Sequence, residues 1–119
     1  MSLKRVSLRD SNLTDANLRD ADLADADLGN ANLTDANLRD ANLTDADLQN
    51  ADLADATLEH AVLIRTNLFD ANLTNCRPHG ATFTDVHIND DTELRSEDHR
   101  EARKSRSKPN RFVRWDNPQ

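Results

Sequence analysis

The chain has 119 residues, of which 36% are hydrophobic and 31% are charged, and its formal net charge is -7. It contains a single cysteine, which excludes an intrachain disulfide and a zinc site built from cysteines. No apolar run near Met1 is long enough for a signal peptide or a membrane span, which predicts a cytoplasmic protein with no membrane partner.

Leucine stands at every fifth position from Leu3 to Leu73, and Pro78, Phe83 and Ile88 continue the series. A small residue, most often alanine, stands two positions before each of them. The apolar positions therefore alternate in steps of two and three, whereas a helix needs steps of three and four. A flat strand fails as well, because a step of five places successive leucines on opposite faces.

A chain that turns a corner once in each five-residue unit removes both difficulties. Four corners of about 90° close a square coil of about 20 residues, and the coils stack at the strand spacing of ~4.8 Å. Each coil then buries its leucines and alanines in a column that is shared with its neighbours. The spacing therefore predicts an all-β solenoid of about 4.5 coils over residues 1–90.

The units ANLTD at 31–35 and ADLAD at 51–55 resemble the A(D/N)LXX motif of the pentapeptide-repeat family. The resemblance runs almost continuously through residues 1–90. It implies a right-handed quadrilateral β-helix, and the hand of the coil comes from the family and not from the spacing. A coiled coil is the structural alternative.

The residue that follows each central leucine sorts the outer surface into four faces, each a column of residues 20 positions apart. The first face carries Lys4, Ala24, Thr44, Ile64 and Thr84; the second carries Arg9, Gly29, Gln49, Phe69 and Asn89; the third carries Thr14, Thr34, Ala54 and Thr74; and the fourth carries Arg19, Arg39, Glu59 and His79.

Aspartates are expected to stack at the ends of these units. Asp15, Asp35 and Asp55 follow the third face, and Asp20 and Asp40 follow the fourth. Two like charges ~4.8 Å apart repel by about 0.9 kcal/mol even at the dielectric constant of water. Two interpretations stay open: the aspartates cap corner turns and keep the surface soluble, or the acidic surface serves a basic partner.

The charge density favours taking the second interpretation seriously. Residues 6–60 hold 12 Asp and 1 Glu against 3 Arg, a net charge of -10. A rod of ~22 Å would face a DNA segment with about 13 backbone charges. Members of the pentapeptide-repeat family that protect DNA topoisomerases such as gyrase are thought to mimic DNA, and the resemblance makes the same role an alternative for this chain.

Val62, Ile64 and Phe69 fall at outward positions of one coil, where other coils carry polar or small residues. Such an exposed apolar group usually marks an interface. The candidate occupants are the chain's own tail, a second copy in a homodimer, or a foreign protein.

The repeat degrades after residue 75, because Pro78 cannot donate a ladder hydrogen bond and the register is lost after Asp90. Cys76 occupies an inward small position and is expected to be buried. Residues 91–119 form a charged tail in which residues 91–106 have the charge order of a short polar helix. The simplest prediction is that this tail docks on the rod with Phe112 and Trp115 near the apolar group or over the last open coil.

No nucleophile–base pair, phosphate loop or metal motif is present, and Glu59, His60 and His79 are better explained as solvated surface residues. The net charge of -7 argues against direct nucleic-acid binding. We therefore expect a non-enzymatic acidic rod, without cofactors, that acts as a protein-binding or scaffold module. The alternatives are a DNA mimic that binds gyrase or another DNA-binding protein, and a consensus-like repeat protein without a specific partner.

Overall fold

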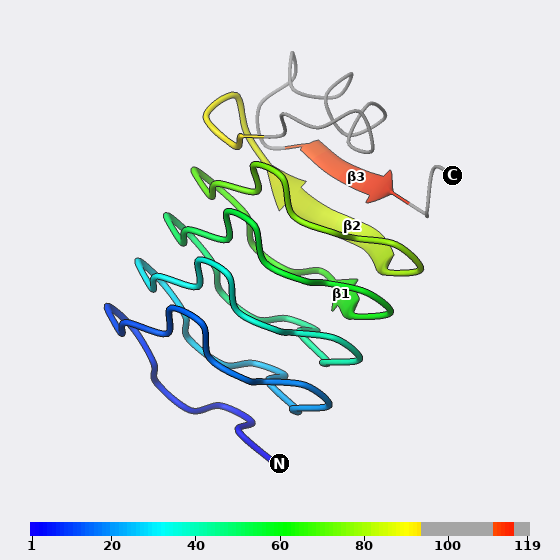
Figure 1. The fold of residues 1–119 in the computed structure, drawn as a ribbon. Coiled ribbons are helices and arrows are strands. Elements are labelled where there is room, and N and C mark those ends of the chain that lie inside the picture. Colours follow the sequence, from blue (N-terminus) through cyan, green and yellow to red (C-terminus); the bar gives the residue numbers. More distant parts are fainter. Residues whose placement is uncertain (94–110, 116–119) are drawn as a thin grey trace.

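A computed structural model shows the chain winding into a stack of square coils (Figure 1). It describes residues 1–93 and, for the backbone alone, residues 111–115. Parallel bridges join residues that are 20 positions apart, from Ser2 with Asp22 to Asp52 with Asn72. This spacing is the 20-residue coil that the five-residue repeat predicted.

Most faces are too short to hold more than one bridge, and only three segments of the described residues are regular strands. These are β1 (Val62–Ile64), β2 (Thr82–Ile88) and β3 (Arg111–Trp115), which form one sheet in the order β1-β2-β3. Strands β1 and β2 are parallel because they lie in successive coils, and β3 runs antiparallel to β2.

A repeating set of backbone hydrogen bonds stacks every coil on the next. The amide of Leu23 donates to the carbonyl of Asn42 at 2.8 Å, and the amide of Asn42 donates back to the carbonyl of Ala21 at 2.9 Å. The pattern repeats at each unit, so the short faces are held by a continuous ladder. A solenoid of this kind gains its stability from contacts between neighbouring coils.

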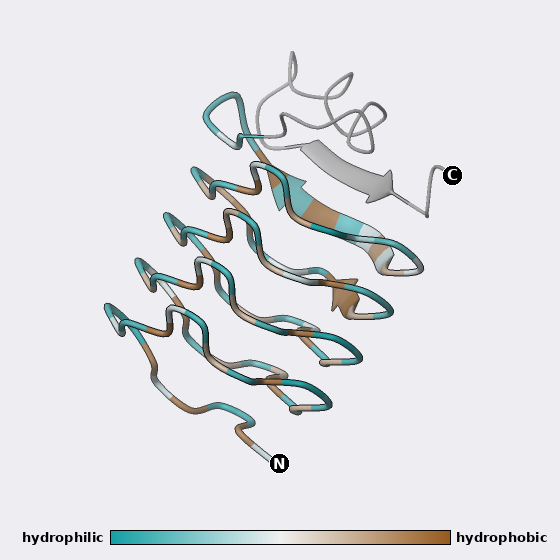
Figure 2. Cartoon of the chain, in the orientation of Figure 1, coloured by the Kyte–Doolittle hydropathy of each residue, from teal (hydrophilic) through white to brown (hydrophobic). Residues whose placement is uncertain are grey.

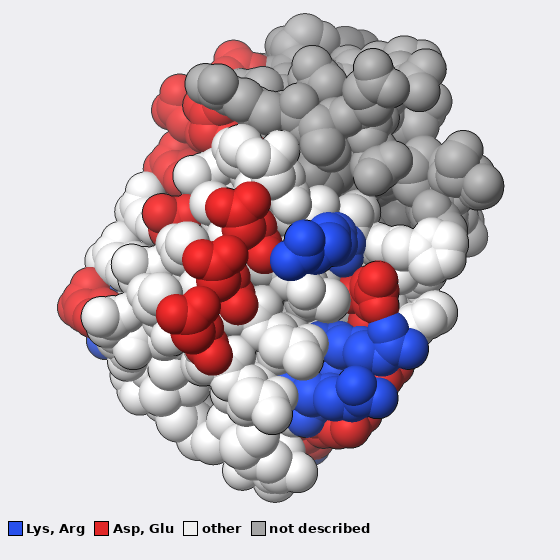
Figure 3. All heavy atoms as spheres, viewed as in Figure 1, with Lys and Arg blue, Asp and Glu red and all other residues white. Residues whose placement is uncertain are grey.

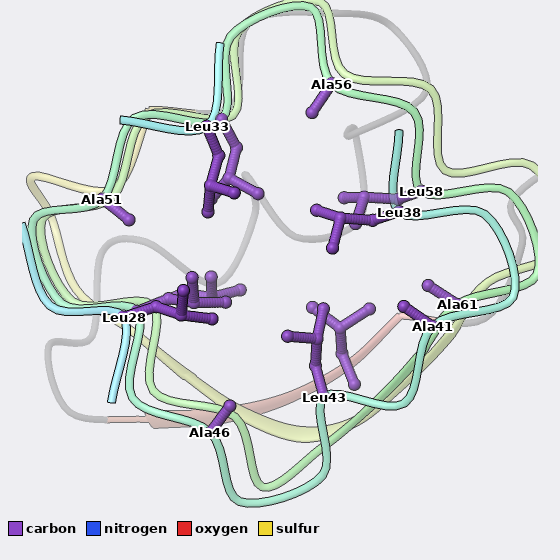
Figure 4. Close-up of a cluster of buried hydrophobic side chains, with 14 of the residues drawn as sticks. Leu28, Leu33, Leu38, Ala41, Leu43, Ala46, Ala51, Ala56, Leu58 and Ala61 are labelled. Carbon is purple, nitrogen blue, oxygen red and sulfur yellow. The ribbon is translucent and has the colours of Figure 1, made fainter. Parts of the chain in front are cut away.

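The leucines and alanines fill the lumen, as predicted. Leu33, Leu38 and Leu43 are completely buried, and so is Ala41. In Figure 4 the labelled side chains all point inward, and Leu58 lies beside Leu38, which belongs to the preceding coil. Along each coil in Figure 2 hydrophobic and hydrophilic residues alternate at short intervals, which reflects this division between lumen and surface.

The last residue of nearly every unit has a positive φ. Asp15, Asp35 and Asp55 have φ values of 63°, 62° and 63°, and Asn75 has 61°. The turn closes with a bond such as that from the Ala36 amide to the Leu33 carbonyl, at 3.0 Å. A positive φ at the third turn residue is typical of type II turns, and Asp, Asn and Gly tolerate it best.

The prediction that these aspartates cap the corners with their side chains is wrong. The capping side chain belongs to the Asn or Asp that precedes each leucine. Asn32 Oδ1, for example, accepts the amide of Thr34 at 3.0 Å, and Asp52 Oδ1 accepts that of Ala54 at 3.0 Å. The terminal aspartate supplies a tolerated backbone conformation, and the side chain of the residue just before the turn supplies the bond.

The C-terminal end of the coil differs from the prediction. The unit that contains Pro78 keeps its turn, because the Ala81 amide donates to the Pro78 carbonyl at 2.8 Å. The ladder also continues beyond Asp90, and Glu93 bridges Asn72. This spacing is 21 residues, so one inserted residue shifts the register instead of ending it.

Thr92 shows how the coil absorbs that insertion. Its buried hydroxyl donates to the Leu68 carbonyl at 2.8 Å. Thr66 makes the same kind of bond to the Leu43 carbonyl at 2.7 Å, from a position where most units have alanine. Thr92 is therefore the inward small residue of the next unit, displaced by one position.

The predicted helix at 91–106 falls largely outside the described residues. Residues 91–93 form a turn and a bridge instead of a first helical turn. Within the described ranges, no helix is long and apolar enough to cross a membrane.

Candidate functional site

Asp15, Asp35 and Asp55 form what we call the acidic ladder, one carboxylate per coil at the corner between the third and fourth faces. The side chains of Asp15 and Asp35 are exposed, and Asp55 is half-buried. Among the ion pairs of the described residues, none involves these three carboxylates. Figure 3 shows acidic side chains gathered in a row across successive coils.

Asp20 and Asp40, which the sequence grouped with the acidic ladder, lie in a different electrostatic environment. Arg19 Nε is 3.6 Å from Asp20 Oδ2, and Arg39 Nε is 3.6 Å from Asp40 Oδ2. Arg39 is also hydrogen-bonded to Glu59 in the next coil. The predicted acidic surface therefore divides into an unpaired column and a column compensated by arginines.

The corner column of the first face contains one paired aspartate. Arg65 donates two hydrogen bonds to the carboxylate of Asp45, both at 2.8 Å. These bonds hold the pKa of Asp45 below its ordinary value, against the weaker opposing effect of burial, and the charge of Arg65 adds to the lowering. The same bonds raise the pKa of Arg65.

The apolar group of Val62, Ile64 and Phe69 is less exposed than the sequence indicated. All three side chains are half-buried, and Met1 is the only exposed large hydrophobic residue of the described chain. The Phe69 ring lies against the His87 ring of the next coil, with centroids 6.2 Å apart. Side chains of adjacent coils therefore cover much of each outward position, so this group is not an open apolar patch.

Phe112 and Trp115 lie in β3, whose backbone pairs with that of β2 in the last coil. Phe112 is opposite His87 and Trp115 is opposite Phe83. The side chains of these two residues lie outside the described part of the structure, so their predicted contact with the apolar group stays a prediction.

His60 and His79 face each other edge-on with ring centroids 6.3 Å apart. No group of three or more His, Cys, Asp or Glu side chains in the described ranges is placed to hold a metal ion. A Cβ at Gly80 would lie 2.5 Å from His60 Nδ1, so a larger residue at this corner would have to displace the His60 ring. Cys76 is buried with 3% exposure, as its inward position predicted.

These features define a non-globular repeat protein of the β-solenoid class, with its functional groups on flat outer faces. Family models identify it further: a pentapeptide repeat region matches residues 1–73, and pentapeptide repeats (8 copies) match residues 61–90. The chain belongs to the pentapeptide-repeat family, whose coil is a right-handed β-helix.

Solved structures agree with this assignment. The pentapeptide repeat protein alr5209 from Nostoc PCC 7120 is 36% identical, with 78% of this chain and 77% of that chain covered and a TM-score of 0.76. A pentapeptide repeat protein of the Arabidopsis thaliana thylakoid lumen is 22% identical, with 93% and 83% covered and a TM-score of 0.57, which supports the fold alone.

A weaker likeness is to QnrB1, a plasmid-mediated fluoroquinolone resistance protein. It is 18% identical, with 73% of this chain and 57% of that chain covered, and its TM-score is 0.44. A superposition of that quality carries no inference about a partner. No curated protein matches the sequence.

Proposed function

We propose that this chain is a non-enzymatic binding or scaffold rod whose acidic ladder contacts a basic surface of a partner protein. The rigid coil fixes the three carboxylates at ~4.8 Å intervals. Such preorganised charge raises association rates and favours a partner of opposite sign.

The observation that carries the proposal is that the corner turn does not need the charge. Asn75 occupies the next position of the same column with a φ of 61°, and Asn30 and Asn50 occupy another column with 60° and 63°. Asparagine therefore satisfies the backbone equally well. Three stacked, unpaired aspartates repel one another, so a role in binding accounts for what the turn does not.

The test compares two triple variants of the full chain. In D15N/D35N/D55N the acidic ladder loses its charge but keeps residues that tolerate a positive φ. In D10N/D25N/D85N three other exposed corners lose the same charge. A flexible lysine–glycine peptide should bind the wild type and the second variant and bind the first about ten-fold more weakly, as measured by fluorescence anisotropy at low salt. Equal weakening in both variants would sink the proposal, because it would show a response to net charge alone.

A second candidate function is DNA mimicry toward a DNA-binding protein such as gyrase. It is favoured by the net charge of -10 over residues 6–60, which is within about a factor of two of the charge of duplex DNA of the same length. In a supercoiling assay, the wild type should inhibit or protect gyrase, and added salt should abolish the effect. An unchanged supercoiling rate at micromolar protein would exclude this candidate.

A further inference from the structure

The backbone hydrogen bonds between successive coils have a direction. Eight amides of the first coil donate to carbonyls of the second coil, whereas only four amides of the second coil donate back. The eight belong to the leucines and the corner residues, such as Leu3 and Arg5, and the four belong to the residues just before a leucine, such as Asp22. Each coil therefore has a carbonyl-rich edge toward the N-terminus and an amide-rich edge toward the C-terminus.

The carbonyl-rich edge of the first coil is open on all four faces within the described part of the chain. The eight carbonyls that correspond to the acceptors of later coils receive no hydrogen bond there, and four amides donate none. These amides are those of Ser2, Ser7, Asn12 and Asn17. The lumen is open at the same end, because Leu3, Leu8 and Leu13 are half-buried whereas Leu33 is completely buried. An unpaired edge of this kind is a template for association with another chain.

The amide-rich edge of the last coil is obstructed. Strand β3 pairs with β2 along the first and second faces, and Figure 1 shows it lying across the C-terminal end of the stack. Because β3 is antiparallel to β2, it ends the parallel ladder instead of extending it. On the fourth face, Pro78 occupies one of the eight donor positions and has no N–H to offer. The two ends of the coil therefore differ: one is open and the other is largely covered.

Hydrogen bonding and charge both indicate what fits the open edge. Two N-terminal edges cannot satisfy each other, because carbonyls outnumber amides on both. An amide-rich C-terminal edge is the matching surface, as it is at every junction inside the coil. The first coil, residues 1–20, has four basic and three acidic side chains, a net charge of +1, whereas residues 74–93 have one basic and four acidic, a net charge of -3. Strand β3 opposes this attraction, since it brings Arg111 and Arg114 to the C-terminal end.

We propose that the N-terminal edge is a docking surface for the C-terminal edge of a second copy of this chain, and that β3 is the strap that keeps the copies apart. Twelve backbone hydrogen bonds join the first coil to the second, and a junction between copies loses one of these at Pro78. A typical protein interface has about 10 direct hydrogen bonds, so the junction is sufficient for association once β3 is released. Head-to-tail contacts do not close on themselves, so they lead to open-ended oligomers. This inference does not depend on the function of the acidic ladder.

The test measures the association of the full chain by sedimentation velocity over a range of concentrations. In V113P/R114P, two prolines remove backbone donors from β3 and so release it from β2. The matched control, V113T/R114T, places residues that suit a strand at the same positions. The wild type and the control should stay monomeric, whereas the average mass of V113P/R114P should rise with concentration to about twice the monomer mass or more.

A second pair of prolines tests the other end of the coil. Adding S2P/S7P to V113P/R114P should restore the monomer, because proline removes two donors from the N-terminal edge and places its ring there. The coil should stay folded in this variant, since neither amide donates a hydrogen bond in the described chain. F112S/W115S is a second release variant, which weakens β3 without proline and should oligomerise to a smaller extent.

Other outcomes overturn the proposal in different ways. If V113P/R114P and F112S/W115S both stay monomeric, the N-terminal edge does not dock a second copy. Oligomers of V113P/R114P that persist after S2P/S7P is added would show that the C-terminal ends associate with each other instead. Wild-type oligomers that S2P/S7P abolishes would show that the edge docks a copy with β3 in place, so that β3 is not the strap.

Discussion

Two corner columns of this coil share one backbone conformation and differ in their electrostatics. In the first-face column, Asp25 and Asp45 have φ values of 61° and 59°, and Arg65 in the next coil binds Asp45 through two hydrogen bonds. In the acidic ladder, Asp35 and Asp55 have φ values of 62° and 63°, and no cation of the described chain pairs with them.

The comparison separates what the fold requires from what it permits. The fold requires a residue that tolerates a positive φ, and Asp, Asn, Arg, His and Gly all occupy such corners here. The fold does not constrain the charge of the residue at that corner. The same turn carries a paired aspartate in one column and unpaired aspartates in the next, so the turn itself does not determine the charge or its pairing.

The largest expected effect on the free energy of unfolding tests whether the same hydrophobic core stabilises both columns. Leu33 precedes the acidic ladder corner at Asp35, and Leu43 precedes the corner at Asp45; both side chains are completely buried. L33A and L43A should each destabilise the chain by about 2–5 kcal/mol, because each leaves a cavity in the lumen. Urea denaturation measures both values. A difference of several kcal/mol between them would show that the columns are not equivalent.

Valine at a corner is the next largest change. A β-branched side chain at a positive φ clashes with its own backbone, so D25V and D35V should each cost roughly 1–2 kcal/mol or more. Thermal melts compare them with D25N and D35N, which should be nearly neutral. If D35V is tolerated and D25V is not, the shared backbone requirement is wrong.

Neutralising the acidic ladder should act in the opposite direction. D15N/D35N/D55N removes two nearest-neighbour repulsions of about 0.9 kcal/mol each at the dielectric constant of water, so the variant should be slightly more stable than the wild type at low salt. The gain should shrink as salt rises toward 1 M, because exposed charges are then screened. A loss of stability at low salt would mean that the aspartates make stabilising contacts.

The smallest effect concerns the paired column and depends on pH. R65N keeps a residue suited to a positive φ and removes the partner of Asp45, so the pKa of Asp45 should rise toward its ordinary value. Since the wild-type pKa is depressed, the pair's contribution is present above about pH 4 and is lost as the pH falls through the folded-state pKa. NMR titration of Asp45 and acid melts of both proteins measure this; an unchanged Asp45 titration in R65N would contradict it.

The inward half of this structure was predictable from the sequence. A strict five-residue spacing can bury Leu33 and Ala36 only inside a square lumen, so periodicity alone assigned them. The positive φ at Asp35 was also predictable from the sequence, because Asp, Asn or Gly at nearly every fifth position is typical of that conformation. That signal was attributed to side-chain capping, whereas the cap is provided by Asn32.

The outer surface was predictable only in part. The 20-residue period places Arg65 above Asp45 in the next coil. Whether the two side chains meet depends on their rotamers, which the spacing of residues does not determine. The half-burial of Ile64 arises from neighbours in adjacent coils, so it could not be judged from its own unit. The one-residue insertion before Thr92 could not be predicted from the sequence, because threonine replaces the alanine that marks the inward position in most units.

The coil's 20-residue period also governs how the chain tolerates changes of length. Inserting one five-residue unit after Asn30 would rotate every later residue by a quarter turn, so Asp35 and Asp55 would stay aligned with each other but no longer with Asp15. Four inserted units would add a whole coil and restore the alignment. Duplication and deletion by whole turns therefore lengthen or shorten the acidic ladder while preserving its geometry, which gives this architecture a simple route for evolving, or engineering, the reach of a binding surface.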